Sequence, residues 1–176
     1  MAVVLSPFRK SKLLHVFNTF FDVNQSGEID ENDLELAVKS VCGARGWGES
    51  DPHYANTQTT LRTIWRVLTS RADKDNDSKE DSSGEGRQRD KTFRDLMFLL
   101  EDSSGDGAID VAEYTALYVA LGIPREECQQ AFNKLSKGEK EVTKERFDEL
   151  WEEYFHSEDR HAPGNFIFGV TEFASA

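Results

Sequence analysis

The chain has 176 residues and a formal net charge of −12, with 33 acidic against 21 basic side chains. This length suits one compact unit with a real core, and the acidic balance argues against nucleic acid or an anionic membrane as the default partner. Two cysteines are too few for a disulfide framework or a zinc cluster. The sequence contains no run of 18 apolar residues, so we expect no stable membrane insertion. Because residues 1–5 do not resemble a signal peptide, we expect a cytoplasmic protein.

The dipeptide Ser6-Pro7 predicts the start of a first helix, since a capping hydroxyl precedes a proline suited to the first helical position. Apolar side chains then recur at helical spacing. They predict a broad buried face formed by Leu13, Leu14, Phe17, Phe20 and Phe21. We interpret these aromatic residues as core rather than as a cofactor site.

This helix leads into the twelve-residue stretch D-V-N-Q-S-G-E-I-D-E-N-D, residues 22–33. In an EF-hand loop, oxygen donors at positions 1, 3, 5, 7, 9 and 12 converge on a hard cation, and a glycine at position 6 permits a sharp turn. Gly27 and Ile29 occupy positions 6 and 8. The predicted donors, with position 7 giving its backbone carbonyl, are Asp22, Asn24, Ser26, Glu28, Asp30 and Asp33. Aspartate at position 12 gives one oxygen more easily than two, so we expect this loop to accept Mg²⁺ as well as Ca²⁺.

An exit helix should continue to about Gly43, followed by a connector over residues 43–53. The next apolar face, which predicts a helix entering a second EF-hand, consists of Leu61, Ile64, Trp65 and Leu68.

The loop expected after that helix is incomplete. Aspartates alternate as ligands do at positions 73, 75 and 77, but Ser78, Glu80 and Gly84 occupy positions 6, 8 and 12. The following residues are polar and offer no apolar face. We therefore expect residues 73–91 to be a solvated, disordered acidic segment. Loose calcium binding by its three aspartates is the alternative.

The stretch D-S-S-G-D-G-A-I-D-V-A-E, residues 102–113, matches every position of the EF-hand loop, with Gly107 at position 6 and Ile109 at position 8. An acidic surface turn with a helix cap would not require this full match. The predicted donors, again with a backbone carbonyl at position 7, are Asp102, Ser104, Asp106, Ala108, Asp110 and Glu113. Glu113 can give both carboxylate oxygens, which favours Ca²⁺.

A fourth loop-like stretch, residues 135–146, lacks ligands, because Leu135, Lys137 and Arg146 occupy coordinating positions. Val142 at position 8 makes a short β pairing with Ile109 plausible. After the last apolar helix comes a tail that we expect to fold back onto the core, with a frayed terminus as the alternative. Its apolar residues are Phe166, Ile167, Phe168, Val170 and Phe173.

Four stretches carry a family resemblance: HVFNTFFDVNQSGEIDENDLELAVKSVCGARGW, the loop at 102–113, the LGIP linker and the ending LWEEYFHSEDRHAPGNFIFG. Together they resemble the calexcitin and sarcoplasmic calcium-binding proteins of invertebrates. The resemblance implies four EF-hands in two pairs with a metal-free fourth hand, and calcium signalling or buffering in excitable cells. The family's second hand is normally intact and followed by a long exit helix, and this chain departs from that pattern.

We therefore expect an all-α fold, a compact EF-hand protein with paired helix-loop-helix units in two lobes. The expected divisions are an N-terminal EF-hand lobe at 1–72, a polar segment at 73–91, a C-terminal EF-hand pair at 92–155, and an apolar tail at 156–176 that packs on the core.

The expected function is binding of two calcium ions by a monomeric buffer or signalling protein. The alternative is a sensor that exposes a hydrophobic surface and regulates a channel or other protein target in neurons or muscle. The chain has only two methionines, which argues against an adaptable groove of the calmodulin type. It contains no H-E-x-x-H motif and no phosphate-binding loop, so we expect no enzymatic activity.

Overall fold

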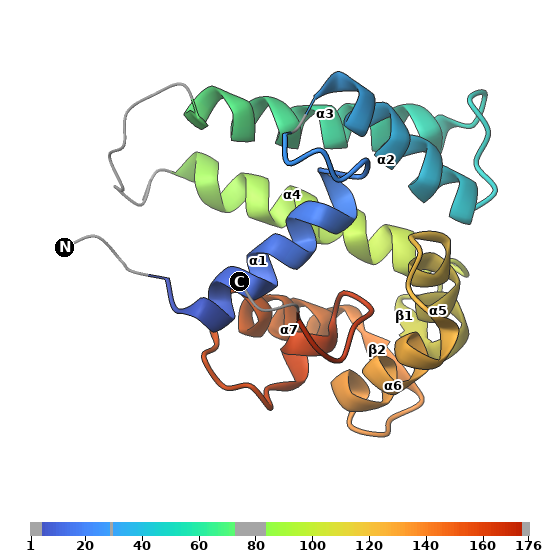
Figure 1. The fold of residues 1–176 in the computed structure, drawn as a ribbon. Helices are drawn as coiled ribbons and strands as arrows, with labels where there is room; N and C mark the ends of the chain where they lie inside the picture. Colours follow the sequence, from blue (N-terminus) through green and yellow to red (C-terminus); the bar gives the residue numbers. More distant parts are fainter. Residues whose placement is uncertain (1–4, 29, 73–83, 174–176) are drawn as a thin grey trace.

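The computed structural model describes residues 5–28, 30–72 and 84–173 (Figure 1). The helices are α1 (Pro7–Phe20), α2 (Glu31–Ala44), α3 (Pro52–Ala72), α4 (Gly84–Glu101), α5 (Val111–Ala120), α6 (Arg125–Ser136), α7 (Lys144–His156) and the 3₁₀ turn η1 (Pro163–Phe166). Strands β1 (Ala108–Asp110) and β2 (Glu141–Thr143) form a short antiparallel pair. The predicted all-α fold is confirmed, and no described helix is long and apolar enough to cross a membrane.

The first helix begins where the sequence predicts. The Ser6 hydroxyl oxygen accepts a hydrogen bond from the Arg9 backbone N–H at 3.1 Å, and Pro7 occupies the first turn. A proline there removes no intrahelical hydrogen bond, because the first N–H groups of a helix have no partner within it. The cap therefore fixes where α1 begins, and Phe8, Val16 and Phe20 of this helix are buried in the core.

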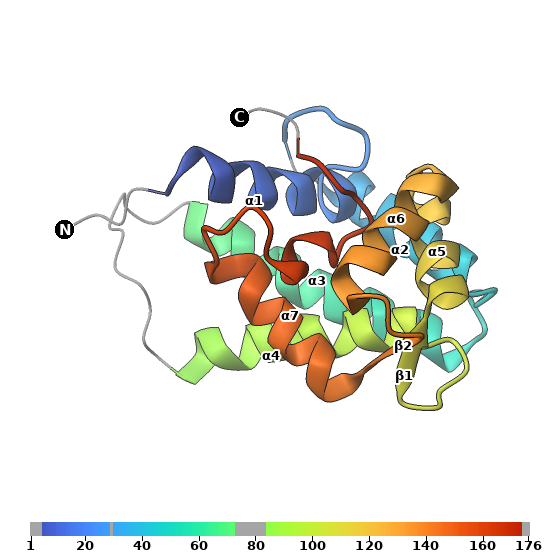
Figure 2. The same ribbon diagram turned by 90° about the horizontal axis from the view of Figure 1, so that it is seen from below.

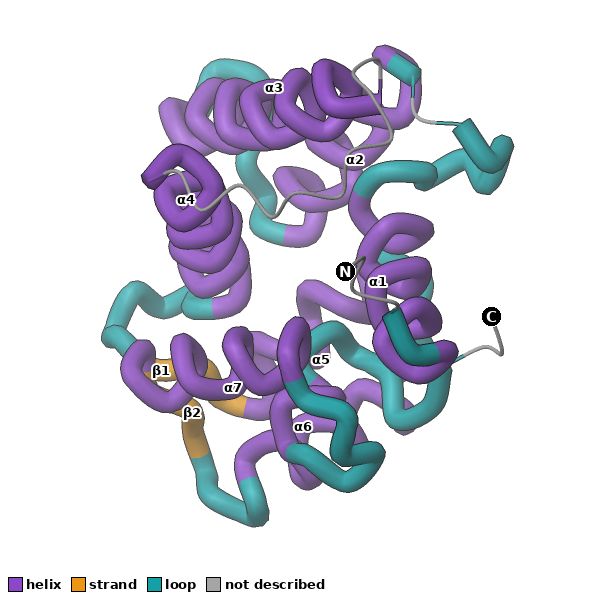
Figure 3. Tube along the Cα trace, turned by 90° about the vertical axis from the view of Figure 1, so that its left-hand side faces the viewer, coloured by secondary structure: helices purple, strands orange, loops and turns teal. Residues whose placement is uncertain are grey.

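Figure 3 places α2, α3 and α4 on one side of the molecule and α5, α6 and α7 on the other. Helix α2 packs on α3 and α3 on α4, while α5 packs on α6. The contacts of α2 with α5 and of α4 with α7 join the two sides. Val38 of α2, Met97 of α4 and Trp151 of α7 accordingly belong to one continuous buried cluster, so the lobes share a core.

Helix α4 begins at Gly84, and this corrects the expectation of a disordered segment reaching Lys91. That expectation rested on the lack of an apolar face, but tertiary contacts support the helix instead. The Trp151 indole N–H donates to Asp90 Oδ1 at 2.9 Å, and a buried indole N–H requires such an acceptor. Helix α4 also packs on α3. The rest of the expected polar segment, residues 73–83, lies outside the described residues.

The C-terminal segment lies between helices from both ends of the chain, as Figure 2 shows. Ile167 and Phe168 are 1% and 0% exposed. The Phe168 ring packs edge-on against Tyr154 with centroids 4.7 Å apart, and its carbonyl lies 2.9 Å from His15 Nε2. The buried Lys12 ammonium of α1 donates to the Ser157 carbonyl at 2.8 Å. The segment therefore connects α1 to the C-terminal EF-hand pair.

Candidate metal centre

In both predicted loops the first aspartate holds the turn. Asp22 Oδ2 accepts the Gly27 N–H at 2.8 Å, and Asp102 Oδ2 accepts the Gly107 N–H at 3.0 Å. Both glycines have φ in the left-handed region, +85° and +91°, where a side chain would be strained. The two aspartates are only 2% and 8% exposed. In each loop a backbone N–H group therefore offsets the cost of burying the first aspartate, and the chain turns sharply at position 6.

The last residue of the first loop, Asp33, closes it from the other side. Its two oxygens accept the backbone N–H groups of Asn24 and Asp30, each at 3.1 Å. Asp30 Oδ1 in return accepts the Asp33 N–H at 3.0 Å, which forms a capping box at the start of α2. Asp33 is completely buried. Positions 3, 9 and 12, which are far apart in the loop, therefore converge.

Glu113 makes the same contacts in the later loop. Its Oε1 accepts the Ser104 N–H at 2.7 Å and its Oε2 the Asp110 N–H at 3.1 Å, while Asp110 Oδ1 accepts the Glu113 N–H at 2.8 Å. Burial raises the pKa of Glu113, but hydrogen bonds from Asp110, Ser104 and Ser103 outweigh it and lower the pKa below its ordinary value. The carboxylate is therefore ionised, as a metal ligand must be.

The middle positions of the first loop also meet. Ser26 Oγ donates to the Glu28 carbonyl oxygen at 2.9 Å, and the Ser26 N–H donates to Asn24 Oδ1 at 2.8 Å. The predicted donors at positions 3, 5 and 7 therefore lie next to each other. Ile29, at position 8, lies outside the described residues.

In the later loop Ser104 Oγ donates to Asp102 Oδ1 at 3.3 Å, and the Ala108 N–H donates to Asp106 Oδ1 at 3.0 Å. Ala108 opens β1, in which Ile109 pairs with Val142 of β2. The pairing considered from position 8 is thereby confirmed. It joins this loop to the fourth one.

Within residues 5–28, 30–72 and 84–173, no three His, Cys, Asp or Glu side chains form a ready-made metal cluster. Both oxygens of Asp33 and both oxygens of Glu113 accept backbone N–H groups. The donor set itself fits a hard cation such as Ca²⁺ or Mg²⁺, since it consists of carboxylate, amide, hydroxyl and carbonyl oxygens.

The fourth loop, residues 135–146, has side chains without oxygen donors at three coordinating positions. Leu135 is buried within α6, and Arg146 forms an ion pair with Glu149 at 2.7 Å. Lys137 adopts a left-handed conformation at the end of α6. These side chains offer no oxygen to a cation, so this loop supports its neighbour through β2.

A polar cluster that the sequence analysis did not identify lies beside the later loop. Glu101, Tyr114 and Tyr118 are all at most 1% exposed, and the Tyr118 hydroxyl donates to Glu101 Oε1 at 2.7 Å. Burial raises the pKa of Glu101 to about 8, although the Tyr118 hydroxyl opposes this shift. The available signal was a glutamate four residues after buried Met97, which places it on the apolar face of α4.

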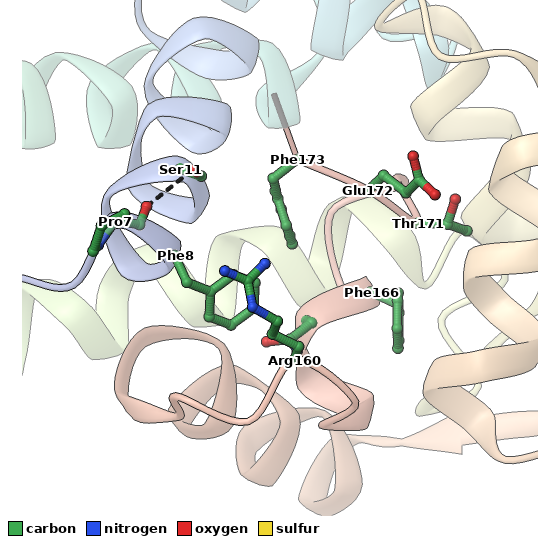
Figure 4. Close-up of a pocket in the computed structure, with 9 residues that line it drawn as sticks. Pro7, Phe8, Ser11, Arg160, Phe166, Thr171, Glu172 and Phe173 are labelled. Carbon is green, nitrogen blue, oxygen red and sulfur yellow. Dashed lines mark hydrogen bonds between the residues drawn. The ribbon is translucent and has the colours of Figure 1, made fainter. Parts of the chain in front are cut away.

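A cavity of about 440 Å³ lies apart from the loops, between the start of α1 and the C-terminal segment (Figure 4). Phe8, Phe166 and Phe173 line it, and the Arg160 guanidinium lies over the Phe8 ring with its carbon 4.8 Å from the ring centroid. None of the twelve predicted metal ligands lines this cavity.

No protein-family model matches the chain. Calexcitin-1 of Caenorhabditis elegans is 32% identical over 186 aligned residues, which cover 96% of this chain and 90% of that protein. The sarcoplasmic calcium-binding protein alpha chain of Penaeus vannamei is 26% identical over 182 residues, covering 90% of this chain and 94% of that protein. The Penaeus relative is named for calcium binding, and the expectation of a non-enzymatic protein agrees with this family.

Solved structures share the fold. A sarcoplasmic calcium-binding protein from amphioxus has a TM-score of 0.65 at 23% identity, covering 96% of this chain and all of that one. A calcium-binding protein of Streptomyces coelicolor has a TM-score of 0.61 at 23% identity, covering 84% of this chain and 97% of that one. With one relative 32% identical across nearly the whole chain, and with this fold, the chain belongs to the calexcitin and sarcoplasmic calcium-binding protein family of EF-hand proteins.

Proposed function

We propose that the protein binds two calcium ions, one in each of the loops at 22–33 and 102–113, and acts as a monomeric cytoplasmic calcium buffer. The observation that carries the proposal is the hydrogen-bond network shared by these two loops. In each loop position 1 holds the position 6 N–H, and positions 9 and 12 cap the following helix. The name of the Penaeus relative, which refers to calcium binding, supports the choice of ion.

The two loops should differ in ion preference. Glu113 is long enough to give a cation both oxygens, whereas Asp33 is shorter and its side chain is fully enclosed. A smaller coordination number suits the octahedral shell of Mg²⁺. The loop at 22–33 is therefore proposed to exchange calcium for magnesium more readily than the loop at 102–113.

A buffer role is supported by the burial of Met97 and of the C-terminal segment. Sensors of the calmodulin type open to expose a methionine-rich surface. Here Met97 is 1% exposed, and Ile167 and Phe168 of the C-terminal segment are buried against the helices. Calcium should therefore expose little new apolar surface.

Calorimetric titration tests the stoichiometry. Wild-type protein should bind two calcium ions and Glu113→Gln only one, because an amide cannot replace a bidentate carboxylate. Glu141→Gln is the matched control, since it makes the same change at an exposed position of the fourth loop. Three ions in the wild type, or two in Glu113→Gln, would contradict the proposal.

A hydrophobic dye distinguishes the buffer from a sensor with a protein target. The dye is added with and without calcium to the whole chain and to a chain ending at His161. A calcium-dependent rise confined to the shorter chain supports the buffer. A large rise in the whole chain supports the sensor, because its groove would then open despite the C-terminal segment.

A further inference from the structure

The residues that flank the loop at 102–113 are both bonded into one buried network. Glu101 directly precedes Asp102, and Tyr114 directly follows Glu113. The Tyr114 hydroxyl donates to the Phe166 carbonyl and accepts the Gly169 N–H at 2.8 Å. The residue after the last predicted ligand is therefore attached to the C-terminal segment.

Tyr118, one helical turn further along α5, completes the network. Its single hydroxyl proton lies between two acceptors, Glu101 Oε1 at 2.7 Å and the Ile167 carbonyl oxygen at 3.0 Å. It thereby bridges the end of α4, the helix that enters the loop, and the C-terminal segment. Because all three side chains are buried, water cannot readily replace these hydrogen bonds.

The close approach depends on a glycine. Gly169 has φ +84°, and a Cβ atom there would lie 2.6 Å from Ile123 Cδ1 and 2.7 Å from Tyr118 Cγ. A side chain at this position would push the segment away from α5. The segment is therefore fitted closely to Tyr118 and Ile123.

We propose that residues 166–169 are a positioning element for the calcium site at 102–113, and this inference rests on the proposed function. Through Tyr114, Tyr118 and Glu101 they hold the end of α4 and the start of α5 at a fixed spacing. The first and last ligands of the loop sit at those two ends. Fixing their spacing before the ion arrives raises affinity, because less conformational freedom is lost on binding.

The loop at 22–33 provides an internal comparison. It is flanked by Phe21 and Leu34, whose apolar side chains offer no hydrogen bond and are 9% and 6% exposed. Phe20, two residues before this loop, packs on Phe168 with ring centroids 5.8 Å apart, but neither flanking side chain of the loop can hydrogen-bond to the C-terminal segment. Loss of the segment's hydrogen bonds should weaken calcium at one loop only.

Tyr118→Phe tests this, with calcium titrated by NMR. The Gly27 and Gly107 amides report on the two loops separately, since each donates to the first ligand of its loop. The Gly107 amide should report about three- to tenfold weaker calcium binding by the loop at 102–113, the range for one buried hydrogen bond. The Gly27 amide should report unchanged binding by the loop at 22–33.

Tyr154→Phe is the matched control. Tyr154 is also fully buried and also packs on Phe168, but its hydroxyl donates to the Lys12 carbonyl of α1 at 2.7 Å rather than to the C-terminal segment. It should leave calcium affinity unchanged at both loops. Equal weakening by both variants would overturn the proposal in favour of a general loss of stability.

The coupling must also act in reverse, because linkage is reciprocal. Calcium should slow hydrogen exchange at the Gly169 amide in wild-type protein but not in Glu113→Gln. If the Gly107 amide responds to calcium but Tyr118→Phe does not alter the midpoint of that titration, the positioning role is wrong while the proposed calcium binding stands. If Gly107 of the wild type does not respond at all, the proposed function fails with it.

Discussion

The loops at 22–33 and 102–113 share an internal hydrogen-bond network but differ in their surroundings. Position 12 is the enclosed Asp33 in one and the half-buried Glu113 in the other. Only the later loop pairs with a described neighbouring strand and contacts the C-terminal segment through its flanking residues. The comparison teaches that the twelve-residue pattern sets the shape of a loop, whereas residues outside the pattern set its contacts with the rest of the fold.

Exchanging position 12 should have the largest effect on this comparison. The longer side chain of Asp33→Glu lets both carboxylate oxygens reach the ion and should shift the preference of the first loop toward calcium over magnesium by about tenfold. Glu113→Asp should shift the preference of the later loop toward magnesium by the same factor. Calcium titrations with and without magnesium measure both. If magnesium displaces calcium mainly from the wild-type loop at 102–113, the proposed ranking is wrong.

The sharp turn at position 6 of each loop could be predicted from the sequence because the residues that form it are local. Twelve consecutive residues contain the donors, the glycine turn and the capping residues such as Asp30 and Asp110, so no distant contact is needed to place them. The start of α4 could not be predicted in this way, since Asp90 is bonded to Trp151, sixty-one residues away. The bonds from Tyr114 and Tyr118 to the C-terminal segment were invisible for the same reason.

The first hand also contacts the C-terminal segment through its entering helix, by the ring contact of Phe20 with Phe168 and by the polar contacts of Lys12. The ammonium of Lys12 donates to Ser157 and Asn165, and burial lowers the pKa of Lys12 to about 8, with nearby Glu158 and Glu153 opposing and Arg9 adding to the shift. Between about pH 8 and 10.5 the unfolded chain binds this proton and the folded chain does not. Stability from this group therefore rises with pH across that window.

Lys12→Met should remove this rise without changing calcium affinity at either loop. Denaturant unfolding in calcium-free buffer, measured from pH 7.5 to 10.5, gives the difference in pH slope between variant and wild type. Lys10→Met, which removes an exposed lysine of the same helix, serves as the control. Identical slopes for wild type and Lys12→Met would contradict the assignment.

The smallest expected effect concerns Arg45, at the end of α2. Its guanidinium carbon lies 5.2 Å from the Trp47 ring centroid, and within the described part of the chain its Nε is buried without a hydrogen-bond partner. Burial lowers the pKa of Arg45, while the negative charges of Glu113 and Asp102 oppose that shift. A fixed positive charge near two predicted ligands competes with the incoming cation. Arg45→Met should therefore strengthen calcium binding at 102–113 by about threefold, as expected for a partly solvated charge.

The effect of Arg45 should be confined to one loop and should fade with salt. Lys39→Met, which removes an exposed charge from the same helix, is the matched control and should change neither Gly27 nor Gly107 titrations measurably. Raising the ionic strength should reduce the difference between Arg45→Met and wild type, because mobile ions screen exposed charges. An equal gain at both loops would mean that Arg45 acts through net charge alone, and a loss of affinity at 102–113 would show that it supports the loop rather than competing with its ion.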